Sequence, residues 1–475
     1  MTYALDASSS YDVASPPGHP EICRWQAAPH TGAVKPALML LAGEQLSLGL
    51  APGVERVVCQ LRYSAGLPEI SVDGLEAELM LSLPGDRECA LVRVPVLRGD
   101  ESRIGCLSID LPPAPDGARL SLRCLPGPLN DPAADWLAVH ELIVAPPELQ
   151  GLARARSFGG LRAANERAHF ATAYRHPMYQ DRFQRANHLD ALIPSARSLG
   201  VSGACTNAFD LAHALLGQRG ASDVPDFSLR LREMALRLGR PPRVLSLCAG
   251  TAATEAALLR GANVKVELLL VDIDESLLAV ACERDWSGSR PAMLVQDVNK
   301  LDVAAASFDL VMCVSGAHHL VELEHVFSQI RAALAPGGEL WLIGEQVGPN
   351  GNRLDTAALA AANAAFAALP EEFRRNQRTR IADSTLPNQD CAEATFEGIR
   401  SDDIERVLSR YFLPVELCRR NVFLWRIVGP DYVLNYDIAS ADHRRLLEQL
   451  VDADLAAAAK GLRPTELHGI YRALG

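Results

Sequence analysis

The sequence has little lysine and no local run of basic residues. These two features limit the class of molecule that the protein is expected to bind. Only four of its 46 basic residues are lysines, and the formal net charge is -12. Nucleic-acid binding depends on clustered positive charge that releases counterions from the phosphates. We therefore expect no nucleic-acid partner.

Paired cysteines and long apolar runs are also missing. The 11 cysteines include no C-x-x-C pair, so they are interpreted as reduced, small apolar residues and not as a disulfide or zinc framework. No cluster of His, Cys and Asp has metal-ligand spacing, which predicts a metal-independent reaction. The N-terminus lacks the pattern of a signal peptide, and runs such as "PALMLLAG" are too short to cross a bilayer. We expect a cytoplasmic protein with no membrane partner.

The 475 residues, 48% of them apolar, suffice for two to four domains. From about residue 36 to 146, short alternating runs are separated by Pro, Gly and Asp, which is typical of an all-β sandwich. The segment "DWLAVHELIVAPPEL" resembles the closing strand of galactose-binding-like jelly-roll modules. Residues 1–150 are thus predicted to form a β-sandwich accessory domain. It would recognise a sugar-like acceptor, or only cover the active site or contact a second copy.

Helical patterns follow, and then strands and helices alternate. Residues 151–240 are predicted to be a helical lid and linker belonging to the catalytic domain, and residues 241–475 that domain itself. Apolar strands such as "RVLSLC", "VELLLVD", "FDLVMCVS" and "ELWLIGE" alternate with helices, which indicates a parallel sheet covered on both faces. "LPVELCRR" and "ELHGIYRAL" are predicted as the sixth and seventh strands. A ligand is expected at the carboxyl ends of the strands.

Several ordered motifs lie on these strands. They are the small-residue loop "LCAGTAATEAAL", Asp272 in "LLLVDIDESLL", Asp297 in "LVQDVNKLDVAAASFDLV", and "CVSGAHHLVELEHVFSQIRAALAPGGELWLIGEQVGPNGNRL". Together they resemble the class I S-adenosylmethionine-dependent methyltransferases. The resemblance implies an α/β, Rossmann-like, seven-stranded domain that binds S-adenosylmethionine.

The loop departs from the family's D-x-G-x-G-x-G, which aligns with residues 246–252 and keeps only Gly250. Because a side chain is disfavoured at positive φ, Cys248 and Ala252 are expected either to have tolerant φ values or to reshape the loop. No G-x-G-x-x-G and no G-K-[ST] occur, which argues against dinucleotide and Walker-type phosphate binding. Small side chains and one tight turn should suffice for a cofactor without pyrophosphate.

The resemblance also assigns roles to single residues. Asp272 would accept hydrogen bonds from the ribose hydroxyls, and Asp297, with the backbone N–H of Val298, would bind adenine. Asp274 is predicted to cap a helix, and Asp309 to be structural. The full set assigned to the cofactor is Ser246, Cys248, Ala249, Gly250, Asp272, Ile273, Asp297, Val298 and Tyr174.

Three residues are predicted to act on the acceptor. His318 and His319 follow the fourth strand, where a histidine would serve as general base for a hydroxyl acceptor; His319 is preferred, and one of the pair is expected only to pack. Glu345, which ends the fifth strand, would hold a hydroxyl or an amine. The expected reaction is O-methylation of a small-molecule or sugar-like acceptor. N-methylation of a small amine and a catalytically silent binding or scaffold protein remain alternatives, and a homo-oligomer is left open.

Overall fold

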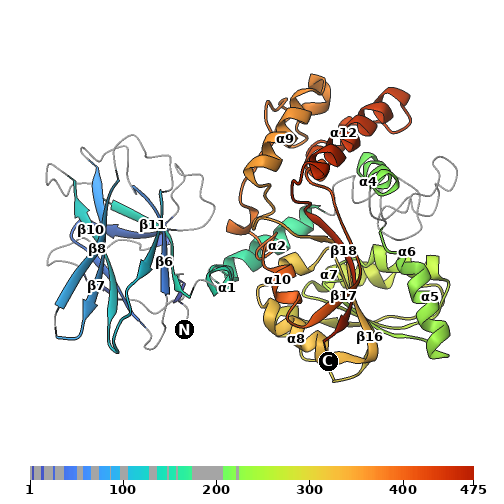
Figure 1. Cartoon of the computed structure of the whole chain (residues 1–475), viewed down its shortest axis with the longest axis horizontal. Coiled ribbons are helices and arrows are strands. Elements are labelled where there is room, and N and C mark those ends of the chain that lie inside the picture. The colour runs from blue at the N-terminus through green and yellow to red at the C-terminus, as the bar shows by residue number, and fades with distance from the viewer. Residues whose placement is uncertain are drawn as a thin grey trace. The chain divides into compact units, whose positions relative to one another are not determined.

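The computed structural model describes residues 3–4, 12–14, 25–26, 37–50, 57–65, 74–85, 87–96, 105–127, 136–146, 149–156, 159–173, 207–220 and 224–474. The chain forms two compact units, Met1–Ala163 and Ala164–Gly475 (Figure 1). The first thirteen residues of the predicted 151–240 segment therefore fall in the first unit.

The first unit consists of two antiparallel sheets. One has the order β3-β4-β11-β6-β9, with β1 also paired to β11, and the other the order β2-β5-β10-β7-β8. The strands of the first sheet are β1 (Tyr3–Ala4), β3 (Trp25–Gln26), β4 (Ala37–Leu41), β6 (Val57–Ala65), β9 (Gly105–Leu111) and β11 (Trp136–Ala145). Those of the second are β2 (Asp12–Ala14), β5 (Gln45–Gly49), β7 (Leu75–Leu83), β8 (Arg87–Val96) and β10 (Arg119–Pro126). The helix α1 (Gln150–Arg156) follows β11.

One apolar core joins these two sheets. It contains Leu38 and Leu61 from the first sheet and Leu46, Leu79 and Leu122 from the second, all buried. In β5, buried and more exposed residues alternate, as expected for a strand with one face on the core. The N-terminal strands are therefore antiparallel and share a core.

The second unit contains a seven-stranded sheet with the order β14-β13-β12-β15-β16-β18-β17. The pairs from β14 to β16 are parallel, and β18 is antiparallel to both of its neighbours. The strands are β12 (Arg243–Leu247), β13 (Glu267–Asp272), β14 (Ala292–Val295), β15 (Phe308–Val314), β16 (Leu334–Gln346), β17 (Phe412–Arg420) and β18 (Glu466–Ala473). The last two match the segments predicted as the sixth and seventh strands.

Helices cover both faces of this sheet, as its apolar strands require. On one face α5 (Phe227–Leu238), α6 (Ala253–Ala262) and α7 (Glu275–Cys282) pack on strand residues such as Val244 and Trp341. On the other, α8 (Leu323–Ala333) and α10 (Ile404–Leu408) pack on residues such as Leu245 and Leu340. Neighbouring residues of one strand thus serve opposite faces. The helix α8 ends before Pro336, because proline and the residue preceding it are disfavoured in a helix.

Further helices gather beyond the carboxyl ends of the parallel strands (Figure 1). They are α4 (Ala208–Arg219), α9 (Thr356–Ala367), α11 (Leu424–Ile427) and α12 (Ala441–Ala459). They share a core that includes Leu211, Phe366, Phe423 and Leu447. Among the helices of the described residues, none is long and apolar enough to span a membrane.

Candidate functional site

The loop between β12 and α6 has a left-handed residue at every second position. Cys248, Gly250 and Ala252 have φ values of 52°, 52° and 50°. These are the three positions that align with glycines of the resembled family. Cys248 and Ala252 therefore do not have φ values that a side chain tolerates easily. Two side chains are held in a conformation that disfavours each by about 1–2 kcal/mol.

Neighbouring strands hold this strained backbone in place. The N–H of Ala249 donates to the carbonyl of Val271 (3.1 Å), and the N–H of Gly250 donates to Asp272 Oδ2 (2.8 Å). Gly316, after β15, packs against the loop: a Cβ there would lie 2.6 Å from the Cβ of Cys248. Sequence reasoning missed this requirement for glycine because the contact joins two separate loops.

Asp272 lies at the carboxyl end of β13, 8% exposed. Its Oδ1 accepts the N–H of Asp274 (2.9 Å), and its Oδ2 that of Gly250. Each carboxylate oxygen has capacity for one more donor. Burial raises the pKa of Asp272, although the backbone donors lower it in part. Ile273, which follows, is 45% exposed and presents an apolar surface beside this carboxylate.

Asp297 lies just beyond the adjacent strand, β14, whose Val295 pairs with Asp272. Its Oδ1 accepts both the backbone and the side-chain N–H of Asn299 (3.0 Å each), and it caps the short helix η3 (Val298–Lys300). The side chain of Val298 is buried. The two acidic residues assigned to ribose and adenine therefore end neighbouring strands.

Two other carboxylates have the structural roles predicted for them. Asp274 caps α7 by accepting the N–H of Ser276 (2.8 Å). Asp309 accepts from Arg240 Nη1 (2.7 Å) and from the N–H of Arg243 (2.8 Å). Burial raises the pKa of Asp309, but these arginines lower it to about 2 overall.

Ser246 lies behind the loop. It is fully buried, and its hydroxyl donates to Glu255 Oε1 of α6 (2.7 Å). The hydroxyl is turned to the helix and away from solvent, and the assignment of Ser246 to the cofactor stays a prediction. Glu255, which sequence reasoning missed, is also buried, and burial raises its pKa to about 7.

The helical turn η4 (Ala317–His319) is built around Glu345. This carboxylate is 0% exposed and accepts the backbone N–H groups of Gly316 (3.1 Å), Ala317 (2.8 Å), His318 (3.0 Å) and Gln346 (3.0 Å). It also contacts Nδ1 of His318 (2.6 Å). Glu345 is thus enclosed and positions His318, and contact of Glu345 with the acceptor stays a prediction.

The two histidines of this turn lie side by side, with ring centroids 4.2 Å apart. Nε2 of His318 is 3.5 Å from Glu397 Oε1, and Nε2 of His319 is 3.4 Å from Glu397 Oε2. Nδ1 of His319 is 2.6 Å from Glu166 Oε1, in α2 (Gly159–Ala173), outside hydrogen-bond geometry. The sequence pattern did not reveal Glu166 and Glu397, because only the fold brings them to the pair.

The two imidazoles differ in environment. Burial lowers the pKa of His318, but the carboxylates of Glu397 and Glu345 raise it well above its ordinary value overall. The His318 side chain is 6% exposed and that of His319 18%. His319 is therefore the more accessible of the two.

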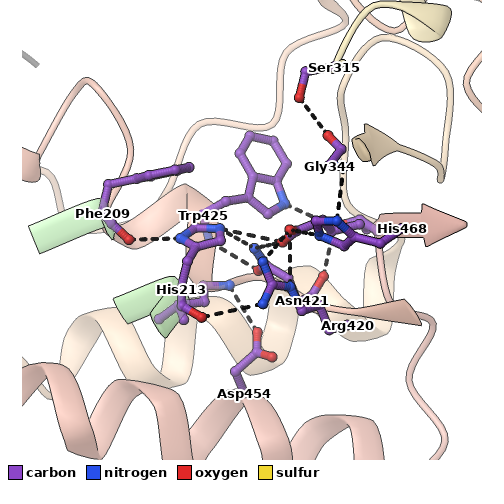
Figure 2. Close-up of polar contacts among 12 residues, drawn as sticks. Phe209, His213, Ser315, Gly344, Arg420, Asn421, Trp425, Asp454 and His468 are labelled. Carbon is purple, nitrogen blue, oxygen red and sulfur yellow. Dashed lines mark hydrogen bonds and ion pairs between the residues drawn. The ribbon is translucent and has the colours of Figure 1, made fainter. Parts of the chain in front are cut away.

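A second buried polar cluster lies where β17 ends and β18 begins. In Figure 2, His213, Arg420, Asn421 and His468 point toward one another. Glu466 accepts from Arg420 Nη2 (2.7 Å), Asn421 Nδ2 (3.0 Å) and His468 Nε2 (2.6 Å). Burial raises the pKa of Glu466, but Arg420, His213 and His468 lower it well below its usual range. The donors and acceptors satisfy one another, which is typical of a structural network.

Tyr174, the remaining residue assigned to the cofactor, lies outside the described residues. The other predicted site residues lie on two adjoining parts of one edge of the sheet. The loop follows β12, Asp272 ends β13 and Asp297 follows β14, whereas the histidine turn follows β15. Since β12 lies between β13 and β15, the loop adjoins both parts.

Comparison with known proteins agrees with this geometry. Residues 244–338 match the model of a methyltransferase domain. Over 93 residues the chain is 40% identical to the ribosomal RNA large subunit methyltransferase G of Pseudomonas paraeruginosa, covering 18% of this chain and 24% of the relative. An uncharacterized protein of Synechococcus sp. is 36% identical over 109 residues, covering 22% and 26%. The chain thus spans about a quarter of the length of these curated relatives.

Solved structures were also found. An S-adenosylmethionine-dependent methyltransferase from Mesorhizobium loti has a TM-score of 0.29 and 17% identity, covering 51% of this chain and 96% of its own. The PH0226 protein from Pyrococcus horikoshii OT3 has a TM-score of 0.28 and 16% identity, covering 52% and 92%. The family match agrees with the resemblance seen in the sequence: residues 244–338 of this chain are similar to a methyltransferase domain.

Proposed function

We propose that this chain is an S-adenosylmethionine-dependent methyltransferase. The observation that carries the proposal lies within the matched domain. The loop after β12 keeps left-handed conformations at Cys248, Gly250 and Ala252 and donates the Gly250 N–H to Asp272. A backbone strained at two non-glycine positions indicates a functional constraint.

The residues present suit that cofactor. The small side chains of the loop leave room for close approach of a ligand, and Asp272 retains acceptor capacity for ribose hydroxyls. Ile273 offers exposed apolar surface beside it, and Asp297 with Val298 would receive the adenine edge. S-adenosylmethionine would supply a methyl group already activated by its sulfonium charge.

The chain's own contribution would then be positioning and removal of a proton. We propose O-methylation of a small-molecule or sugar-like acceptor, with the hydroxyl proton passing to His319. His319 is the more accessible of the pair, and the carboxylate of Glu166 lies 2.6 Å from its Nδ1, on the side of the ring away from Nε2. The N-terminal β-sandwich would help to recognise the acceptor, as the sequence predicts.

Other activities are outcomes of the same test. N-methylation of a small amine would use the same edge of the sheet. One of the relatives described above is named as a ribosomal RNA methyltransferase, so RNA belongs in an acceptor screen despite the net charge of -12. The screen would supply cofactor with a labelled methyl group to pools of small molecules, sugars, amines and RNA. Transfer to RNA alone would contradict our acceptor class, and transfer to none would favour a silent binding protein.

Replacement of Gly250 tests cofactor binding directly. Gly250→Val places a β-branched side chain at φ 52° in the loop, and we expect at least about tenfold weaker binding of S-adenosylhomocysteine by calorimetry. The matched control is Gly239→Val, at φ 64° after α5, where an added Cβ meets nothing within 4 Å. It introduces comparable strain away from the loop.

Thermal unfolding measures cofactor binding by the same two variants in a second way. S-adenosylhomocysteine should raise the melting temperature of the wild type and of Gly239→Val, because a ligand that binds only the folded state stabilises it. If Gly250→Val binds as tightly as the control, the assignment of the loop is wrong.

A further inference from the structure

We propose that His318, His319 and Glu397 form a binding site for one divalent transition-metal ion. One ligand atom from each residue lies within 4.8 Å of the other two. Two imidazoles and one carboxylate are a ligand set that zinc and non-haem iron(II) use in proteins. The sequence predicts a metal-independent reaction. Glu397 is distant from the two histidines along the chain, so the sequence pattern did not reveal this set of ligands.

The spacing of the ligand atoms suits an ion better than it suits direct hydrogen bonds. The Nε2 atoms of His318 and His319 lie 3.5 Å and 3.4 Å from the two oxygens of Glu397. These distances exceed the usual 2.7–3.2 Å of an N–H···O hydrogen bond. Two ligands each about 2.1 Å from an ion are about 3.4 Å apart at a tetrahedral angle. The two distances from the histidines to Glu397 therefore match those between ligands of one ion.

Each ligand has a neighbouring group on its outer side. His318 presents Nδ1 to Glu345 Oε1 (2.6 Å), and Nδ1 of His319 lies 2.6 Å from Glu166 Oε1, outside hydrogen-bond geometry. Glu397 accepts from Asn352 Nδ2 at Oε1 (2.9 Å). A histidine that ligates a metal usually places its other nitrogen against a carboxylate or a carbonyl, which orients the ring. Glu345 orients His318 in this way, Glu166 lies beside the second ring, and both histidines leave Nε2 directed at the same carboxylate.

The outer partners are themselves anchored by the backbone. Glu345 accepts four backbone N–H groups, and Glu166 Oε2 accepts the N–H of Phe396 (3.0 Å). The N–H of Ile399 donates to the carbonyl of His318 (3.0 Å), which ties the segment of Glu397 to the histidine turn. A preorganised set of ligands of this kind favours metal binding.

The charge of this cluster and its exposure to solvent also suit a divalent cation. Three carboxylates, of Glu166, Glu345 and Glu397, surround two imidazoles, so a 2+ ion would offset buried negative charge. The side chains of His319 and Glu397 are 18% and 27% exposed. That accessible side would leave a coordination position for water or an acceptor oxygen.

A role for the ion in methyl transfer rests on the proposed function, whereas binding of the ion to this site does not. An ion held here would bind the acceptor oxygen as a Lewis acid and lower the pKa of the hydroxyl, whose proton would pass to solvent water on the accessible side. His319 would then act as a ligand and not as the base. Binding and transfer can therefore be tested apart.

The binding test uses the full chain, stripped with a chelator and titrated with Co²⁺, whose visible absorption reports its ligands. We expect one Co²⁺ per chain, displaced by Zn²⁺. We expect at least tenfold weaker binding for Glu397→Gln and His319→Ala, and tenfold to hundredfold weaker binding for the outer variant Glu166→Gln. The controls are Glu372→Gln, an exposed glutamate, and His325→Ala, a histidine away from the cluster. Metal-free melting curves show that each variant folds.

Three results would overturn the site: no Co²⁺ or Zn²⁺ bound by the wild type, binding lost equally in the controls, or full affinity in Glu397→Gln and His319→Ala. Transfer at an unchanged rate by the stripped protein would overturn the use of the ion and leave His319 as base. Metal bound at this site without methyl transfer to any acceptor would contradict the proposed function and leave the site standing.

Discussion

At the scale of single residues, the number of hydrogen-bond donors around a buried carboxylate sets the direction in which its pKa shifts. Glu345 is buried with four backbone N–H groups and a histidine around it. Burial raises its pKa, but the charge of His318 and these hydrogen bonds lower it overall. Glu255 is equally buried, and its side chain accepts the hydroxyl of Ser246. Burial therefore dominates and raises the pKa of Glu255 to about 7.

This raised pKa predicts a pH-dependent stability. A carboxyl whose pKa is higher in the folded protein than in the unfolded chain favours folding while it is protonated. That contribution is fully present below about pH 4.5 and is lost as the pH rises through about 7. Glu255→Gln should therefore be more stable than the wild type at pH 8, by up to about 3 kcal/mol, and close to it at pH 4.5.

Denaturant unfolding at the two pH values measures this difference. Glu275→Gln provides the control, because Glu275 is an exposed glutamate of α7, and its variant should show no gain at pH 8. An equal gain in both variants, or none in Glu255→Gln, would show that Glu255 is not buried as described.

At the scale of elements, carboxylates from distant segments hold the short turns at the sheet edge. Glu345 of β16 holds η4, and Asp454 of α12 holds the start of α11 (Figure 2). Asp454 is fully buried and accepts the N–H groups of Val422 (3.1 Å), Phe423 (2.8 Å) and Leu424 (2.9 Å). Neither short segment has the sequence pattern of a stable helix, so each depends on its acceptor.

Removal of Asp454 should therefore be costly. Asp454→Ala leaves three buried N–H groups without their acceptor, and we expect a loss of about 3 kcal/mol or more in the free energy of unfolding. Asp452→Ala, two residues away, removes a 63% exposed carboxylate paired with Arg219 and should cost less than about 1 kcal/mol. Similar losses in the two variants would contradict the buried role of Asp454.

The same contrast explains what the sequence could predict. Strands such as β12 and β13 are uninterrupted apolar runs, and a cap such as Asp274 acts on residues close to it, so both were predicted. The enclosure of Glu345 and the burial of Ser246 depend on partners from other elements, and neither was predicted from the sequence. The metal cluster depends on Glu166 and Glu397, which tertiary structure alone brings to the histidine pair.

At the scale of the whole molecule, every described residue assigned here to the cofactor, the histidine pair or the metal lies in one of the two compact units, Ala164–Gly475. The sheet, its covering helices and the segment of Glu166 all belong to it. The other unit has its own apolar core. The role predicted for this unit, recognition of the acceptor, can therefore be tested separately from cofactor and metal binding.

This separation predicts the behaviour of a shortened chain. A protein of residues 164–475 should bind S-adenosylhomocysteine and Co²⁺ with affinities within about threefold of the full chain, because it keeps the loop, Asp272 and all three proposed ligands. If the β-sandwich recognises the acceptor, the same protein should lose affinity for the acceptor, seen as a raised KM, while kcat changes little. Calorimetry and steady-state kinetics on both chains would measure these quantities. Loss of cofactor binding in a folded 164–475 chain would show that the first unit takes part in the site, and an unchanged KM would leave it a structural role.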